Sequence, residues 1–193
     1  MDRTLVLASS SPHRRELLDR LRLEYQVCPP DIDESRLPGE PATDYVARLS
    51  VEKAQAVAAR FPDALIIGSD QAAVLGDDIL GKPGAHERAL AQLKAASGRS
   101  VRFLTGLTLL DARSGLAQTE VVPFTVHFRA LDDAALDRYL RAEQPYNCAG
   151  SFKSEGLGIV LFERLEGDDP TALVGLPLIR LVAMLDQAGQ RLP

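Results

Sequence analysis

The 193-residue sequence contains only two cysteines, Cys28 and Cys148. Two are too few for a disulfide framework or a structural zinc site, so each is expected to be a free thiol. No stretch approaches the ~20 consecutive apolar residues that a membrane-spanning helix needs. The N-terminal segment also lacks the apolar core of a signal peptide. These absences favour a cytoplasmic protein without membrane attachment.

The chain also lacks an excess of positive charge: it has 22 lysines and arginines and 27 aspartates and glutamates, which gives a net charge of −5. Such a chain has no overall attraction for nucleic acid or for an anionic membrane. A polyanionic ligand would have to be bound by a local cluster of basic residues. The hydrophobic share of 46% is enough for a core, and the length predicts a single domain over residues 1–193.

The N-terminal region combines an apolar strand, a hydroxyl-rich turn and the start of a helix. Residues 4–8 (TLVLA) predict a buried strand, and Ser11 is a good helix N-cap. The turn would place free backbone N–H groups beside the hydroxyls of Ser9 and Ser11. The guanidinium groups of Arg14 and Arg15 follow within the first helical turn. This combination suits an anion such as phosphate, and a capped helix with solvated arginines is the alternative.

The most informative stretch is residues 65–83, LIIGSDQAAVLGDDILGKP. Residues 65–67 predict a strand buried on both faces that stops before Asp70. A carboxylate at the end of such a strand needs a metal, a proton or a basic partner. The extended pattern then resumes, and residues 76–78 predict a tight hairpin turn that leads to Lys82. The hairpin would bring Asp70 and Lys82 to one cleft, and an ordinary surface hairpin is the alternative.

Two further segments carry charges whose role the local sequence leaves open. The loop at 31–40 is rich in carboxylates, Glu34 among them, and could either ligate a hard cation or be solvated. The helix predicted from Thr43, as its N-cap, to about residue 60 contains Lys53. Lys53 either reaches a phosphate or lies on a solvated, charged helix face.

The rest of the chain alternates between helical and extended patterns, which predicts an α/β fold. Helices are expected over 85–96, 132–143 and 178–187, and strands over 24–28, 101–110, 118–128 and 159–165. The two long strands 101–110 and 118–128 should form an antiparallel pair. The Gly- and Ser-rich segment that follows residue 146 is expected to wrap a ligand.

Several separated motifs together resemble the Maf family of nucleoside triphosphate pyrophosphatases. They are LASSSPHRRELL, VARLSVEKA, IIGSDQ, GKP, TGL, CAGSFKSEGLG and VGLPL, in this order over nearly the whole chain. GSDQ and GSFKSEG are most similar to the YceF-type bacterial subgroup, which acts on 7-methyl-GTP. The resemblance implies an α/β fold with an elongated mixed β-sheet flanked by helices, in two lobes with a nucleotide cleft between them.

The same resemblance implies a hydrolase that cleaves between the α and β phosphates of a nucleoside triphosphate. The products would be a nucleoside monophosphate and diphosphate, and the cofactor a divalent cation such as Mg, Mn or Co. For 7-methyl-GTP the role would be house-cleaning of modified nucleotides. Two alternatives stay open: the same reaction on dTTP, UTP or another modified nucleotide, and a non-catalytic, nucleotide-binding regulator of septation. A homodimer is compatible with the family pattern.

The family pattern also assigns roles to individual positions. Asp70 matches the catalytic proton acceptor and, with Glu34, is a candidate metal ligand. The positions that match phosphate-binding residues are Ser9, Ser11, Arg14, Arg15, Lys53 and Lys82. The positions associated with base choice are His13, Gln71 and Glu155.

Two of these positions carry a physical argument of their own. Asp70 is expected to be a weak base at neutral pH, since an ordinary aspartate has a pKa of ~3.9, so metal assistance is expected. A carboxylate at Glu155 would favour the cationic 7-methylguanine base over plain guanine. His13 departs from the pattern, because many family members have arginine there.

Overall fold

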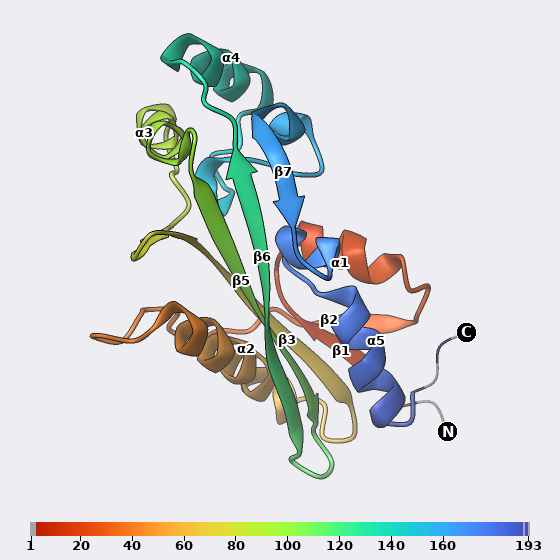
Figure 1. Cartoon of the computed structure of the whole chain (residues 1–193). Coiled ribbons are helices and arrows are strands. Elements are labelled where there is room, and N and C mark those ends of the chain that lie inside the picture. The colour runs from red at the N-terminus through yellow and green to blue at the C-terminus, as the bar shows by residue number, and fades with distance from the viewer. Residues whose placement is uncertain (1–2, 191, 193) are drawn as a thin grey trace. The chain divides into compact units, whose positions relative to one another are not determined.

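The computed structural model describes residues 3–190 and 192 (Figure 1). These residues divide into two compact units, and the chain passes between the units several times. Unit 1 contains residues 3–71, 105–122 and 169–190 with 192. Unit 2 contains residues 72–104 and 123–168. The prediction of a single domain over the whole chain stays a prediction.

The described residues form a mixed sheet of seven strands. The strands are β1 (Leu5–Ala8), β2 (Tyr25–Val27), β3 (Leu65–Leu75), β4 (Asp78–Leu80), β5 (Ser100–Asp111), β6 (Ala117–Phe128) and β7 (Phe162–Glu166). Their order is β2-β1-β3-β5-β6-β7, and β4 pairs with β3 outside this path. Strand β1 is parallel to both β2 and β3, whereas β4 and β7 are antiparallel to β3 and β6. The predicted α/β fold with a mixed sheet is confirmed.

In unit 1, helices cover both faces of the sheet (Figure 1). The helices of this unit are α1 (Pro12–Asp19), α2 (Ala42–Ala58) and α5 (Leu178–Gln187). Leu5 and Leu7 of β1 pack in one apolar cluster with α1 and α5, whereas Val6 and Ala8 pack in another with α2. Alternate side chains of a strand point to opposite faces, so a strand covered on both sides is apolar throughout.

Helix α2 lies directly on the sheet at two glycines. A Cβ atom at Gly68 of β3 would overlap the carbonyl oxygen of Ser50, and one at Gly106 of β5 would overlap that of Val46. Only glycine therefore allows the helix backbone to approach the strands this closely. Lys53 lies one turn beyond Ser50, so this approach carries its side chain toward the sheet.

Unit 2 contains the helices α3 (His86–Ala96) and α4 (Asp133–Glu143), which contact each other. Its core includes four phenylalanines whose rings meet edge to face, with centroids 5.0 to 5.6 Å apart: Phe103, Phe128, Phe152 and Phe162. Edge-to-face contacts of this kind are the favoured geometry between aromatic rings. These contacts join strands β5, β6 and β7 to the segment around Phe152.

The predicted interruption before Asp70 is wrong, because β3 runs unbroken from Leu65 to Leu75. Polar residues can stay inside this buried strand because each has a partner. The hydroxyl of Ser69 donates to the carbonyl oxygens of Gly106 at 2.8 Å and Gly175 at 3.0 Å. Asp70 is paired with a lysine ammonium group, as the site geometry below shows.

Two other boundaries also differ from the prediction. Helix α2 begins at Ala42 with Pro41 as its N-cap, so Thr43 lies inside the helix and does not cap it. Strand β7 begins only at Phe162, because residues 157–161 form a 3-10 helix. The elements β1, β2, α3, α4 and α5 lie within one residue of their predicted ranges. No helix within residues 3–190 is both long and apolar enough to cross a bilayer.

Candidate functional site

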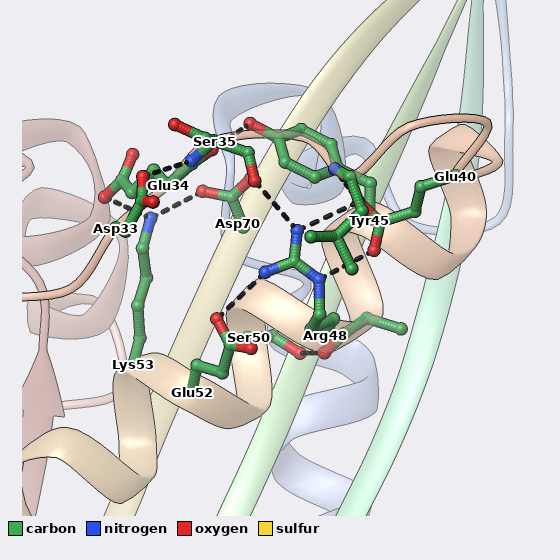
Figure 2. A network of polar contacts seen from close by, with 12 residues as sticks. Asp33, Glu34, Ser35, Glu40, Tyr45, Arg48, Ser50, Glu52, Lys53 and Asp70 are labelled. Carbon is green, nitrogen blue, oxygen red and sulfur yellow. Dashed lines mark hydrogen bonds and ion pairs between the residues drawn. The ribbon is translucent and has the colours of Figure 1, made fainter.

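Three charged groups meet in unit 1 at the middle of strand β3 (Figure 2). The ammonium nitrogen Nζ of Lys53 lies 2.5 Å from Oδ1 of Asp70 and 2.9 Å from Oε1 of Glu34. Lys53 and Asp70 are buried, with 5% and 8% of their surface exposed, whereas Glu34 is exposed. Because a buried charge is costly without a partner, the lysine and the aspartate stabilise each other. Two carboxylates thus converge on one ammonium group.

The acidic loop that carries Glu34 is attached to helix α2. The hydroxyl of Tyr45 donates to the backbone oxygen of Glu34 at 2.9 Å, and Nη2 of Arg48 donates to that of Ser35 at 3.1 Å. Arg48 also binds both carboxylate oxygens of Glu40, at 2.7 and 2.9 Å. These bonds from Arg48 lower the pKa of Glu40 to about 2, so this ion pair persists in acid below the usual pKa of a glutamate. Figure 2 shows this network continuing into the Lys53 cluster.

In the hydroxyl-rich turn between β1 and α1, the predicted N-cap of α1 is confirmed. The side-chain oxygen of Ser11 caps helix α1 by accepting from the backbone N–H of Arg14 at 3.4 Å. The hydroxyl of the buried Ser9 accepts from the N–H of Ser11 at 3.1 Å and from Nη1 of Arg14 at 3.4 Å. Arg15 is exposed. The turn thus gathers N–H donors, hydroxyls and a guanidinium at a helix N-terminus, which is chemistry suited to an anion.

The turn and the charged cluster are linked through Gly175. The carbonyl oxygen of Gly175 accepts from Nε of Arg14 at 2.8 Å and from the hydroxyl of Ser69, the neighbour of Asp70, at 3.0 Å. Desolvation lowers the pKa of the Arg14 guanidinium, while the negative charges of Asp70 and Glu34 act in the opposite direction. Arg14 is therefore within electrostatic range of both carboxylates.

Two residues predicted for base choice, Gln71 and His13, also lie in unit 1. The amide nitrogen of Gln71 donates to the carbonyl oxygens of Ala172 at 2.7 Å and Leu173 at 3.1 Å, and to the hydroxyl of Thr105 at 3.1 Å. These bonds fix the orientation of the Gln71 amide. His13 is half-buried on α1. The role of both residues in base choice stays a prediction.

The remaining two predicted residues, Lys82 and Glu155, lie in unit 2, and both are exposed. The charges of both residues shift the pKa of the half-buried thiol of Cys148. Burial raises the pKa of that thiol most, and the charge of Glu155 raises it further, whereas Lys153 and Lys82 lower it. Lys82 and Glu155 are therefore both within electrostatic range of Cys148. The predicted meeting of Lys82 with Asp70 stays a prediction, since the two residues belong to different units.

Asp169 is a structural residue of this site that the sequence reasoning missed. It is 1% exposed and accepts from the N–H and hydroxyl of Thr171 at 3.0 and 2.6 Å, and from the N–H of Ile179 at 2.8 Å. It thereby holds the 3-10 helix over 170–174 and the start of α5, and with them Gly175. An aspartate before Pro-Thr is a signal for such side-chain-to-backbone bonds.

The carboxylates of the site fit a divalent cation that binds together with a polyphosphate. No three His, Cys, Asp or Glu side chains within residues 3–190 and 192 form a metal cluster. Asp70 and Glu34 nevertheless converge on one cation, the Lys53 ammonium. Mg²⁺ is usually held by one or two carboxylates, with substrate phosphates and water completing its shell.

A mixed α/β sheet that presents a buried lysine–carboxylate cluster beside a hydroxyl-rich helix start defines a protein suited to polyphosphate chemistry. Residues 4–188 match the family described as Maf-like protein, and the chain belongs to this family. The family predicted from the separated motifs is thereby confirmed.

Named relatives of the chain include three bacterial proteins, each called 7-methyl-GTP pyrophosphatase. The one from Nitrosococcus oceani is 62% identical over 186 residues, which cover 96% of this chain and 94% of the relative. The one from Alkalilimnicola ehrlichii is 60% identical over 185 residues, covering 96% and 93%. The one from Pseudomonas aeruginosa is 60% identical over 189 residues, covering 98% of both chains.

Proposed function

We propose that this protein is a nucleoside triphosphate pyrophosphatase that hydrolyses 7-methyl-GTP to 7-methyl-GMP and diphosphate. The observation that carries the proposal is an identity of 60 to 62% over nearly the full length with relatives that bear this name. The enzyme class implied by the separated motifs agrees with those names. So does the substrate implied by GSDQ and GSFKSEG.

The triphosphate is proposed to bind at the turn between β1 and α1. It brings about four negative charges to a protein whose own net charge is −5, so cations must be concentrated locally. The backbone N–H groups of the turn, the hydroxyls of Ser9 and Ser11 and the guanidinium groups of Arg14 and Arg15 provide such a place. Lys53 and Lys82, which also match phosphate-binding positions of the family pattern, are proposed to complete the phosphate ligands.

Asp70 is proposed to act on the attacking water. The water oxygen forms a bond to the α-phosphorus, the bond to the oxygen that bridges the α and β phosphates breaks, and diphosphate leaves. Asp70 accepts the proton of the water, and its contact with Lys53 at 2.5 Å fixes the orientation of the carboxylate. A divalent cation (Mg, Mn or Co) held by Asp70 and Glu34 would supply charge neutralisation and make the water more acidic.

The base is proposed to be selected by charge. A guanine methylated at N7 is cationic, and the exposed carboxylate of Glu155 favours it over neutral guanine. Gln71 and His13 are proposed to contribute contacts to the base.

A pyrophosphate-release screen tests the proposal. The purified protein is mixed with 7-methyl-GTP, GTP, dTTP or UTP in the presence of Mg, Mn or Co, and kcat/KM is measured for each pair. The expected result is the highest kcat/KM for 7-methyl-GTP. A preference for dTTP or UTP would favour the first alternative, and binding without release of diphosphate would favour a nucleotide-binding regulator. A homodimer is a separate proposal, which sedimentation of the same sample would test.

A further inference from the structure

The loop that carries Lys82 is attached at both of its ends to other parts of unit 2. At the first end, the carbonyl oxygen of Gly81 accepts from the side-chain amide nitrogen of Gln92 at 3.0 Å. At the other end, the N–H of Gly84 donates to the carbonyl oxygen of Tyr146 at 2.9 Å. Gly84 has a left-handed backbone (φ +69°), which few other residues adopt without strain.

The first attachment continues into a buried anchor. The amide oxygen of Gln92 accepts from the hydroxyl of Ser151 at 2.5 Å. Ser151 is fully buried and itself has a left-handed backbone, with φ of +64°. Because the Gln92 amide both donates and accepts, its orientation is fixed, and it joins the loop to residue 151.

The second attachment is fixed by the side chain of Tyr146. Its hydroxyl is bonded to Nδ1 of His86 at 3.0 Å, and Nε2 of the same ring is bonded to Oδ1 of Asp137 at 2.8 Å. His86 belongs to α3 and Asp137 to α4, so this end of the loop is attached to both helices of unit 2.

We propose that Gln92 is a positioning residue for Lys82. A lysine reaches its ligand through a flexible side chain, so the protein can restrict the exposed Lys82 ammonium chiefly by fixing its backbone. Without the Gln92 bond, the loop would be held only at Gly84, so the ammonium would spread over more positions and phosphate binding would lose part of the benefit of pre-organisation. The inference rests on the proposed phosphate role of Lys82.

The test compares two glutamines of the same chemistry. Gln118 lies in unit 1, and its amide nitrogen donates to the carbonyl oxygen of Met184 at 3.1 Å, which makes Gln118→Ala a matched control. Binding of inorganic tripolyphosphate is measured by calorimetry without divalent cations for the full-length protein, Gln92→Ala, Gln92→Glu, Lys82→Ala and the Lys82→Ala/Gln92→Ala double variant. Gln92→Glu keeps the size of the side chain but replaces the N–H donor with an acceptor.

Gln92→Ala and Gln92→Glu should each weaken tripolyphosphate binding about 5- to 10-fold, the effect of one lost hydrogen bond, and Gln118→Ala should leave it unchanged. In the Lys82→Ala background, Gln92→Ala should add no further loss, because the group that it positions is gone. If Gln92→Ala weakened binding equally in the wild-type and Lys82→Ala backgrounds, its role would be structural and the inference would be overturned. Unchanged binding in Gln92→Ala would also overturn it, and so would a wild-type protein that does not bind tripolyphosphate. Failure of the full-length protein to hydrolyse any nucleotide would instead remove the proposed function, and the tripolyphosphate comparison would still measure the Gln92 effect.

Discussion

The two units present their candidate residues in opposite ways. In unit 1, Lys53 and Asp70 are buried, lie on a helix and a strand, and hold each other at 2.5 Å. In unit 2, Lys82 and Glu155 are exposed and lie outside helices and strands. Groups that must be placed accurately for bond breaking gain from rigid elements, whereas loops tolerate variation in what they recognise. The residue proposed to act on water therefore lies on a strand, whereas the residues of unit 2 that are proposed to contact the phosphates and the base lie on loops.

The largest effect is expected from Asp70→Asn. The asparagine oxygen can still accept from Lys53, so the site should stay intact, but the side chain can no longer accept the proton of water. We expect diphosphate release to fall about a thousandfold with nucleotide binding retained, measured by turnover and by calorimetry. Asp63→Asn, at an exposed ion pair with Arg113 in the same unit, is the control. Near-normal turnover in Asp70→Asn would remove Asp70 from the reaction.

The next largest effect is expected from Lys53→Met. This change leaves the buried carboxylate of Asp70 without its ammonium partner, which should lower the free energy of unfolding by about 3 kcal/mol in a urea titration. Adding Asp70→Asn should recover part of this loss, because an uncharged amide is less costly to bury. If Lys53→Met were as stable as the wild-type protein, the pair would contribute nothing to unit 1.

A smaller effect, confined to selectivity, is expected from Glu155→Gln. Removing one exposed charge should reduce the ratio of kcat/KM for 7-methyl-GTP to that for GTP about fivefold, since exposed charges interact weakly through water. Tripolyphosphate binding should not change. Glu163→Gln, at another exposed carboxylate of unit 2, serves as the control. An unchanged ratio of the two specificity constants would refute the base-reading role.

The smallest effect is expected from Glu40→Gln and depends on pH. The pKa of Glu40 is depressed from 4.5 to about 2 by Arg48, so its contribution to stability is full above pH 4.5 and is lost as the pH falls through 2. The variant should therefore be slightly less stable than the wild-type protein at pH 7, and the difference should shrink toward pH 2. Urea unfolding at the two pH values measures it, and a difference independent of pH would contradict the assignment to this carboxylate.

The sequence predicted the family, the order of the elements and the capped turn before α1, because these depend on local patterns. That Ser11 caps α1 could be predicted from the few residues around it. The unbroken strand β3 could not be predicted, because Ser69 and Asp70 keep their place through partners elsewhere in the chain. Gly175, one partner of Ser69, is 106 positions away.

The attachment of Lys82 was missed for the same reason. Gln92 has an ordinary position in an amphipathic helix, and only the fold brings its amide to Gly81 and Ser151, the latter 59 positions away. Neither bond leaves a pattern in the nearby sequence. Motifs therefore identify the residues proposed to touch the substrate more readily than those that hold them in place.

Gly68 and Gly106 have a consequence for protein engineering. Because they let the backbone of α2 rest on β3 and β5, the depth of the Lys53 ammonium is set by the main chain rather than by neighbouring side chains. Exposed positions of α2 other than Tyr45 and Arg48, which hold the acidic loop, can therefore be changed without moving the helix. One added methyl group beneath the helix, by contrast, would lift the lysine away from Asp70.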